Sequence, residues 1–559
     1  MRKDATWEQA RQGRRAHDGD AGDGASPQSP RRSPPSVVSA RRWSSAAPTV
    51  TLSTPTGTPT TGVTVGGAGY NPYEIVDVYW DTQNVARVAT DGMGAFSGAK
   101  FKVPASADPG QHWVVTQGLS SHYAAMKAFT VRTNWTQPGF GASHAGFNGF
   151  ENVLNTGNVD ELGLDWSGDM TLGKDDTSPV VAGGVAYMVG ADGYVYAFST
   201  TTHERLWKTA LPAGTGGIGL AYANNVLYIT AYTSAGNGML VAMNTTTHKV
   251  AWTAGTGYYN IANSPAVAGN VVYTATTDGV LSAFPTVCGG SGKPVCGTPL
   301  WTANAGSGLT GTPAIYGDNG PMVYVVAFDG KVRAYPTKCG GASQPACGTL
   351  AWWGSTSQGD AGSIIYGGPS TDGQNVYVGA NNGKVFAFRA KCQPYADGMC
   401  YEAWSAQTPG AIYGTPAVAN GVVYVPSDGG LLLAYKSNCS ANGGTCGPVW
   451  VGGSRGSYYG PTVANGVVYT LDYNTHNINA FAVGCATGGA TCQPLSTVNT
   501  QTLWSAPVLS DGAVYIGSRD GLDVYDASAP AAGMAAPKPQ LSQLHSDARI
   551  AVQPAHAAL

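Results

Sequence analysis

Short runs of apolar residues recur along residues 178–527, and each run ends at a tight turn. Runs of this kind begin at residues 178, 219, 264, 312, 368, 415, 460 and 506, so the interval lies between 41 and 56 residues. Each run leads to a turn such as Asn420-Gly421 or Asp511-Gly512, a Val-Tyr strand, a second turn, and a strand ending in Ala-Phe or Ala-Tyr. Asn-Gly and Asp-Gly favour two-residue hairpins, because both central positions need positive φ. The pattern therefore predicts consecutive antiparallel strands in every copy.

A fourth predicted strand carries a tryptophan in six of the copies. These tryptophans are Trp207, Trp252, Trp301, Trp352, Trp404 and Trp450. Four antiparallel strands repeated eight times are the signature of a propeller. We therefore expect an all-β chain whose main part, residues 158–528, is an eight-bladed β-propeller.

The ends of the repeat array predict how the ring closes. The eighth copy ends at Ala527 without a tryptophan strand of its own, and a tryptophan strand without a copy lies upstream, from Asn158 to Trp166. We expect this upstream strand to complete the last blade. The seventh copy departs from the pattern, because Ser496 stands where the tryptophan is expected.

Residues 47–133 show a different pattern, with apolar and polar positions alternating between turns every 8–12 residues. Seven short strands in this length predict a small immunoglobulin-like β-sandwich without the antibody-type disulfide. Its expected strands are 49–53, 62–67, 75–81, 85–91, 95–103, 111–117 and 124–132. Residues 134–157 are expected to be a lead-in linker. Residues 1–46 and 529–559 are polar or rich in Ala and Pro, and we expect both segments to be disordered.

Composition narrows the function classes. Only 11% of the 559 residues are charged and the net charge is −3, so nothing favours nucleic acid or an anionic membrane as partner. No apolar run reaches the ~18 residues that a membrane-spanning helix needs. Residues 1–46 contain no recognisable export signal, since the apolar stretch between their arginine pairs is only Val37-Val38.

All ten cysteines fall in five close pairs, and each pair lies between the third strand and the tryptophan strand of a copy. The pairs are Cys288/Cys296, Cys339/Cys347, Cys392/Cys400, Cys439/Cys446 and Cys485/Cys492. Spacings of seven or eight residues without a nearby histidine do not match zinc sites, and no Cys-x-x-Cys occurs. Five local disulfides are the prediction, and they place the protein outside the cytosol, in the extracellular space or on the cell surface.

The repeat resembles the pyrroloquinoline-quinone (PQQ)-type propeller repeat, which quinoprotein alcohol dehydrogenases share with assembly scaffolds of the BamB type. The resemblance covers about residues 158–527, and the segment from Trp135 to Asn152 resembles the entry segment of secreted members. In that family the tryptophan docks between neighbouring blades. The quinoprotein enzymes also carry an adjacent Cys-Cys, acidic and amide ligands for Ca²⁺, and often a Cys-x-x-Cys-His haem segment. This sequence has no adjacent Cys-Cys and no haem motif, so the resemblance carries over no catalytic residue.

Aromatic residues stand just before several innermost strands and are the leading candidates for a binding site. We expect Tyr259, Tyr366, Tyr413, Tyr459 and Trp504 to gather at the mouth of the channel, with Asp360 and Arg455 as polar anchors. Flat rings there could bind a sugar face, a peptide or a planar cofactor. The alternative is that the rings plug the channel against one another.

Two other sets of polar residues have simple structural explanations. Acids in the second turns could bind a cation or a polyol, although Asp also favours a turn before Gly; these are Asp192, Asp278, Asp329, Asp428 and Asp520, with Asn382 in the same position. His203 and His248 occupy matching turn positions, which indicates a local structural role.

Three functions remain open from the sequence. The first is a non-catalytic secreted or cell-surface propeller that binds a glycan, cell-wall or protein partner on its aromatic face. The second is a PQQ-dependent quinoprotein dehydrogenase with Ca²⁺, and no cofactor is predicted outside that alternative. The third is an assembly scaffold like BamB, which would lack a lipid-anchoring cysteine because the first cysteine is Cys288.

Overall fold

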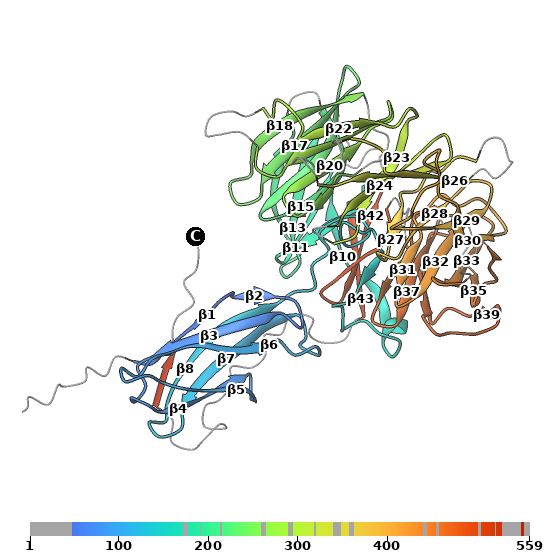
Figure 1. The fold of residues 1–559 in the computed structure, drawn as a ribbon. Helices are drawn as coiled ribbons and strands as arrows, with labels where there is room; N and C mark the ends of the chain where they lie inside the picture. Colours follow the sequence, from blue (N-terminus) through green and yellow to red (C-terminus); the bar gives the residue numbers. More distant parts are fainter. Residues whose placement is uncertain are drawn as a thin grey trace, which may run out of the picture. The chain divides into compact units, whose positions relative to one another are not determined.

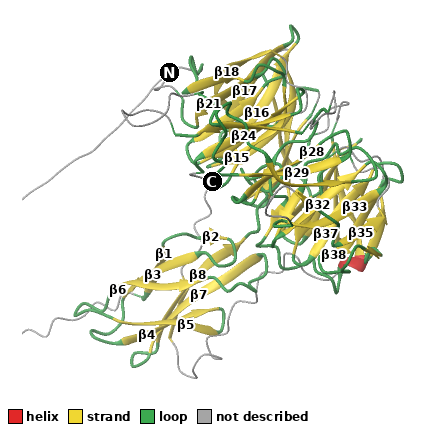
Figure 2. Ribbon diagram, turned by 45° about the vertical axis from the view of Figure 1, so that its right-hand side comes forward, coloured by secondary structure: helices red, strands yellow, loops and turns green. Residues whose placement is uncertain are grey.

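A computed structural model shows a chain built almost wholly from β-strands (Figure 1). It describes residues 47–170, 177–190, 192–212, 215–258, 264–288, 295–317, 320–338, 348–356, 363–439, 444–453, 458–500, 505–519, 521–527 and 549–552. Within this part of the chain, the short 3₁₀ helix η1 (Val159–Glu161) is the one helix, drawn red in Figure 2.

The first body of strands spans residues 49–131 and forms two sheets. One sheet has the order β1 (Thr49–Leu52), β3 (Gly62–Ala68), β6 (Phe96–Lys102). The other has the order β2 (Thr56–Gly57), β8 (Tyr123–Val131), β7 (Gly110–Gly118), β4 (Ile75–Trp80), β5 (Gln83–Ala89). Their inner faces share one apolar core around Trp80, Phe101 and Phe129. Each of the seven expected strands is present to within a few residues.

Strand β44 (Arg549–Val552) corrects part of the expectation for the tail. Residues 529–559 are expected to be disordered, but Arg549–Val552 pair in parallel with Tyr123–Met126 of β8. The pairing is possible because β8 lies next to the short strand β2, which covers only Thr130 and Val131. The rest of that edge of β8 presents unpaired backbone groups, and an extended segment can satisfy them.

Most of the remaining strands form eight sheets within the described residues, each with a core of four antiparallel strands. Sheet 1 holds β11 (Val180–Ala182), β12 (Val185–Val189), β13 (Tyr194–Ser199) and β14 (Arg205–Ala210); sheet 2 holds β15 (Thr215–Ala223), β16 (Val226–Thr233), β17 (Asn237–Asn244) and β18 (Lys249–Tyr258). Sheet 3 holds β19 (Ala266–Ala268), β20 (Val271–Ala275), β21 (Val280–Pro285) and β22 (Trp301–Asn304); sheet 4 holds β23 (Leu309–Ile315), β24 (Met322–Ala327), β25 (Lys331–Pro336) and β26 (Trp352–Ser355).

The other four sheets repeat this order. Sheet 5 holds β27 (Ser370–Thr371), β28 (Asn375–Gly379), β29 (Lys384–Arg389) and β30 (Glu402–Gln407), with β34 (Gly444–Thr445) added; sheet 6 holds β31 (Ala417–Ala419), β32 (Val422–Ser427), β33 (Leu431–Lys436) and β35 (Trp450–Gly453), with β39 (Ala490–Cys492) added. Sheet 7 holds β36 (Thr462–Ala464), β37 (Val467–Asp472), β38 (Asn477–Ala482) and β40 (Ser496–Asn499), with β9 (Phe147–Asn148) added; sheet 8 holds β41 (Val508–Ser510), β42 (Ala513–Ser518), β43 (Gly521–Ala527) and β10 (Leu162–Asp169).

Strand β10 completes sheet 8 from far upstream in the sequence. It pairs antiparallel with β43 from Leu162 opposite Ala527 to Asp169 opposite Gly521. This is the pairing that the unpartnered tryptophan strand predicts. A strand that joins two distant parts of the chain holds them together through a whole ladder of backbone hydrogen bonds.

The eight sheets pack on one another in a closed cycle. One hydrophobic cluster lies between each consecutive pair from sheets 1 and 2 to sheets 6 and 7. The last cluster joins sheets 7, 8 and 1, with Tyr469, Tyr515 and Tyr196 among its members. Each sheet therefore buries both faces, which explains the near-continuous apolar runs of the middle strands.

Four of the predicted disulfides form within the described residues, with Cα–Cα distances of 5.5–6.3 Å. Cys339 and Cys347 lie outside them. Each bridge closes a loop that runs along the outer strand of the preceding sheet. In that loop the amide of Cys296 donates to Thr253 O (2.7 Å), that of Cys400 to Trp353 O (2.7 Å) and that of Cys446 to Ser405 O (3.0 Å), and Cys492 lies opposite Gly452.

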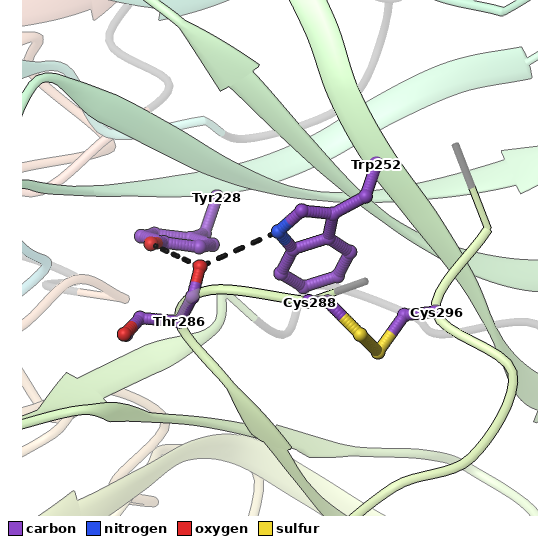
Figure 3. The surroundings of a disulfide bond; sticks show 5 residues. All are labelled: Tyr228, Trp252, Thr286, Cys288 and Cys296. Carbon is purple, nitrogen blue, oxygen red and sulfur yellow. Dashed lines mark hydrogen bonds between the residues drawn. A yellow bond between two sulfur atoms is a disulfide. The ribbon is translucent and has the colours of Figure 1, made fainter. Parts of the chain in front are cut away.

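The tryptophan of the preceding sheet docks against the same loop. In Figure 3 the Trp252 indole and the Tyr228 hydroxyl both donate to Thr286 O, at 3.3 and 3.1 Å, beside the Cys288–Cys296 bridge. Trp404 donates to Ser437 O and Trp450 to Val483 O, each at 2.9 Å. In all three cases the acceptor precedes the first cysteine by two residues. We call this arrangement the stapled junction.

Candidate ligand-binding cavity

Residues 133–148 form a segment that touches all eight sheets, and we call it the hub segment. Its backbone or side chains bond to the equivalent residue of every innermost strand. In sheet order the bonds are Trp135 N to Val181 O (2.8 Å), Tyr222 N to Thr136 O (2.7 Å), Gln137 Nε2 to Val267 O (2.8 Å), Ile315 N to Ala142 O (2.6 Å), Thr371 N to Ser143 O (3.0 Å), Val418 N to Ala145 O (2.7 Å), Val463 N to Gly146 O (2.7 Å) and Asn148 Nδ2 to Leu509 O (2.8 Å).

The hub segment also closes on itself. The Asn148 amide donates a second hydrogen bond to Thr133 O at 3.0 Å, so the end of the segment meets its beginning. Thr133 and Glu151 are both held at the β41–β42 turn, where Thr133 N donates to Asp511 Oδ1 and Gly512 N donates to Glu151 Oε2. The segment that the sequence analysis treats as a linker thus supplies the missing backbone partners of eight strand edges.

Glycine is required where the hub segment passes closest to the sheets. Gly146 has φ +63°, and a Cβ there would lie 2.8 Å from the Ala417 Cβ and 2.9 Å from Pro461 O. Only a residue without a side chain fits such an approach.

A cavity of about 500 Å³ lies over the hub segment and is lined by residues from all eight sheets. Trp135, Pro138, Gly139, His144 and Gly146 of the hub segment line one end. The residues that precede or begin the innermost strands line the rest, among them Ser178, Ile218, Ser264, Thr312, Thr415 and Pro507. The hub segment bonds to residues further along these strands than the residues that line the cavity, so it forms the floor of the cavity.

Aromatic rings line one side of the cavity, mostly at the starts of the innermost strands. Tyr366, Tyr413 and Tyr459, three of the candidate site residues, line it together with Tyr458 and Phe328. The other predicted site residues lie outside the described residues; these are Tyr259, Trp504, Asp360 and Arg455. Phe328 was not singled out, because it stands in a second turn and only the turn geometry brings it to the cavity.

The rings form an arc across sheets 4 to 7. Ring centroids are 6.3 Å apart for Phe328 and Tyr366, 5.5 Å for Tyr366 and Tyr413, and 5.1 Å for Tyr413 and Tyr458. Tyr366 and Tyr458 remain 46% and 39% exposed. The rings contact one another, and Tyr366 and Tyr458 keep accessible surface beside the cavity.

Two acids of the second turns are engaged by basic residues of their own sheets. Asp192 accepts from Lys208 at 3.1 Å, and Asp329 accepts from Arg333 at 3.0 Å. Asp428 differs, because its carboxylate acts on Tyr458 of the next sheet. Burial, and after it the charge of Asp428, raise the pKa of Tyr458. In the described residues no group of three or more His, Cys, Asp or Glu side chains could hold a metal ion. Asp520 lies outside the described residues.

The floor holds two polar groups that sequence reasoning did not select. The His144 ring is buried, and burial lowers its pKa to about 4, so the ring is neutral above that pH. His144 Nε2 and Trp135 Nε1 have no hydrogen-bond partner among the described residues. No repeat pattern marks these residues, because the hub segment occurs once.

Comparison with known proteins agrees with this architecture. Residues 191–291 match the family model described as outer membrane protein assembly factor BamB. The repeats are of the PQQ type. The propeller resembles the quinohemoprotein alcohol dehydrogenase from Comamonas testosteroni, with a TM-score of 0.51, 14% identity, and coverage of 71% of this chain and 81% of that one.

Two further solved structures are similar to this PQQ-type chain. Quinohemoprotein alcohol dehydrogenase ADHIIG from Pseudomonas putida HK5 has a TM-score of 0.51 at 15% identity, covering 73% of this chain and 82% of its own. BamB from Moraxella catarrhalis has a TM-score of 0.49 at 15% identity, covering 65% and 99%. A search of curated proteins found no match. At these identities the structural likeness establishes the fold alone.

Proposed function

We propose that this chain is a non-catalytic, eight-bladed propeller that binds a ligand in the cavity between the hub segment and the aromatic mouth. The observation that carries the proposal is the cavity itself. It is floored at one end, rimmed by exposed tyrosines at the other, and lined by all eight sheets. Concave sites with apolar walls and a few convergent polar groups are the usual ligand sites of proteins.

The described lining residues do not fit the cofactor that the fold family suggests. PQQ is a polycarboxylate, and Ca²⁺ takes oxygen ligands that commonly include carboxylates. The described lining residues include no Asp, Glu, Lys or Arg. They offer neither a cation to the quinone carboxylates nor an acidic ligand to the metal, which favours a binding role over quinoprotein catalysis.

A screen of small molecules by thermal shift, followed by titration calorimetry, tests the proposed binding. Tyr413→Ala and Tyr458→Ala remove aromatic surface from the mouth and should weaken any cavity ligand about tenfold or more. Tyr395→Ala is a matched control, since Tyr395 is 65% exposed, pairs with Tyr401 and does not line the cavity. Ligands that bind the Tyr413 and Tyr458 variants as they bind the parent would refute the cavity as the site.

Addition of PQQ and Ca²⁺ tests the enzymatic alternative separately. Stoichiometric quinone absorbance retained after gel filtration, together with dye reduction by an alcohol, would establish a dehydrogenase. We expect no retained absorbance.

We propose an extracellular or cell-surface location, which the four disulfides support. In the described part of the chain, no helix has the length and apolar character to cross a membrane. Peptide mapping without reduction should recover five local bridges, Cys339–Cys347 included.

We further propose that residues 47–133 form an immunoglobulin-like module that serves as a spacer or adhesive unit. Two facing sheets with strand orders 1-3-6 and 2-8-7-4-5 support this. The shared core contains no disulfide, because residues 47–133 contain no cysteine.

A further inference from the structure

The sheet that contains β8 is buried on its outer face as well as on its inner face. Residues directly opposite one another on neighbouring strands share a face, so Tyr79, Val115 and Met126 form one row across β4, β7 and β8. Their chain neighbours Val78 and Ala125 point the other way, into the core that the two sheets share. The row therefore lies on the outer face, yet Val115 and Met126 are only 0% and 1% exposed.

The smaller sheet shows how an uncovered outer face differs. Along its strand β6, buried residues are separated by exposed ones, and Ser97, Lys100 and Lys102 are exposed. Along β4, every residue from Val76 to Trp80 is buried. A strand is buried throughout when both of its faces are covered.

The described residues provide no second layer over this outer face. The apolar cluster on it consists of Tyr79, Val115, Ala124 and Met126, with Trp113 packed against it. All five side chains come from strands of the same sheet. The burial therefore requires a covering segment from elsewhere in the chain.

The C-terminal segment leaves the propeller beside the end of β8. Strand β43 ends at Ala527, one residue after Asp526, which lies opposite Ala513 of β42. The β41–β42 turn just before Ala513 holds the residues that follow β8, since Thr133 N donates to Asp511 Oδ1 at 2.6 Å. Residue 528 is thus close to the end of β8 that joins the hub segment.

Strand β44, red beside β8 in Figure 1, begins at the opposite end of β8. The two strands are parallel, with Arg549 opposite Tyr123 and Val552 opposite Met126. A parallel partner needs a crossover connection, so the chain between Ala527 and β44 has to travel the length of β8. Strand β8 has nine residues and spans about 30 Å. The connecting residues 528–548 can extend to about 70 Å, which is ample.

The surroundings of β8 leave one face for this crossing. The shared core fills the inner face, and β2 and β44 take the free edge of β8. The outer face of the smaller sheet is exposed. The outer face that carries Val115 and Met126 lies along the route and is buried.

We propose that this outer face is a docking surface for the chain's own C-terminal segment, residues 528–559, which crosses Tyr79, Val115 and Met126 and then adds β44 to the edge of β8. The segment ties the last propeller sheet to the full length of residues 47–133. This surface is separate from the cavity, so the proposal does not depend on ligand binding there.

Hydroxyl-radical footprinting of the full-length, disulfide-bonded protein tests the proposal. Met126 should be protected in the parent and react about tenfold or more faster in a variant that ends at Ala527, because methionine oxidation follows exposure. Met93, which is 78% exposed, should react equally in both proteins and calibrates the radical dose. A synthetic peptide of residues 528–559, added to the shortened protein, should restore the protection of Met126.

A variant that lacks residues 1–46 is the matched control, and its Met126 should stay protected. Trp80, buried in the shared core, reports whether residues 47–133 remain folded. A protected Met126 in the variant that ends at Ala527 would overturn the proposal. Exposure of Met126 on removal of residues 1–46, with Trp80 still protected, would overturn it too, because the N-terminal segment would then be the cover.

Lysine cross-linking of the intact parent tests the same surface without truncation. Lys538 of the C-terminal segment should be linked to Lys127 of β8. Links from Lys538 to Lys100 or Lys102 of the smaller sheet, or no link to Lys127, would overturn the proposal. This result decides the matter if Trp80 becomes reactive in the shortened protein.

Discussion

The same position between neighbouring sheets is built in two different ways in this molecule. At the stapled junctions a disulfide-closed loop lies beside the tryptophan of the preceding sheet. Between sheets 8 and 1, and again between sheets 1 and 2, a histidine takes the place of the loop. His203 stacks on Trp166 at 5.1 Å, and His248 stacks on Trp207 at 4.7 Å, with interplanar angles of 11° and 25°.

The two solutions bury the tryptophan to different extents. Trp404 and Trp450 are 1% and 0% exposed at stapled junctions, whereas Trp166 and Trp207 are only half-buried beside their histidines. The difference follows from loop length. The histidine lies in a tight turn between β13 and β14 or between β17 and β18, with positive φ at His203 and His248. Such a turn is too short to run along the neighbouring strand.

A longer loop can reach the neighbouring strand, but ordering it costs conformational entropy. The disulfide reduces that cost by constraining the unfolded chain. The bridge thus enables the loop to pair with the outer strand of the preceding sheet, as Gly444–Thr445 pairs with Trp404–Ser405. This pairing also covers an exposed sheet edge that could otherwise associate with other chains.

The junction of sheets 7 and 8 is a third case and explains Ser496. Strand β43 leads to no loop within the described residues that could receive a tryptophan. Leu154, Val159 and Leu162, which follow the hub segment, fill the space and join the cluster that includes Tyr469 and Tyr525. Sheet 7 therefore has Ser496 in place of the tryptophan at the junction where these residues replace the usual loop.

Replacing the tryptophan should give the largest difference between the two junction types. Trp404→Ala removes a fully buried indole and its hydrogen bond to Ser437, so we expect a loss of about 3–5 kcal/mol in unfolding free energy. Trp207→Ala, at a half-buried site, should cost about 1–2 kcal/mol. Denaturant unfolding with hydrogen exchange on β30 and β14 measures both. Equal costs would contradict the comparison.

The hub segment serves both junction types, so weakening it should affect them alike. Burial lowers the pKa of His144 to about 4, below the ordinary value near 6.5 of the unfolded chain. The unfolded state therefore binds more protons between these values, and stability should fall by about 3 kcal/mol as the pH drops from 6.5 to 4.

His144→Phe abolishes this part of the acid sensitivity, and chemical unfolding at pH 7 and pH 4 compares the two proteins. An identical pH dependence in parent and variant would show that His144 is not buried as described.

Removing one bridge should weaken only its own junction. The double variant Cys439→Ala/Cys446→Ala opens a loop whose bridged cysteines are seven positions apart. We expect the unfolding free energy to fall by about 2–3 kcal/mol. Hydrogen exchange should rise on β34 and β30 and stay unchanged on β14 and β18. Uniform loosening of all sheets would argue against a local role for the bridge.

The histidine stack should give the smallest effect. His248→Ala removes a ring that stacks on Trp207, for which about 0.5–1.5 kcal/mol is expected. His248→Phe should recover most of that loss, since a phenyl ring can also stack. Thermal unfolding of the parent, His248→Ala and His248→Phe under reducing and under oxidising conditions tests this. The stability lost in His248→Ala should be the same in both conditions.

Much of the architecture follows from periodic features of the sequence. Eight copies of one strand pattern predict the sheets, Trp404 and its equivalents predict the outer strands, and the unpartnered strand ending at Trp166 predicts its pairing with β43. The four described disulfides follow from cysteine spacing. These features are local or repeated, so each copy supports the interpretation of the next.

The lining of the cavity could be predicted only in part. Tyr366, Tyr413 and Tyr459, which line it, were candidates because they occupy matching positions before the innermost strands. Trp135 and His144 were missed because they belong to a segment that occurs once and has no periodicity. The glycines around them indicate turns, but turns do not show which strands a segment will meet.

The sequence by itself determined the sheets, their outer tryptophans and the staples, because those depend on side chains a few residues apart. Only the tertiary structure decided that residues 133–148 run along the inner edges of the sheets and bond to eight strands in order. Each innermost strand leaves one edge of backbone groups unpaired, and closing the ring brings all eight edges to one place. A single segment can satisfy them there, and in doing so it forms the floor of the cavity.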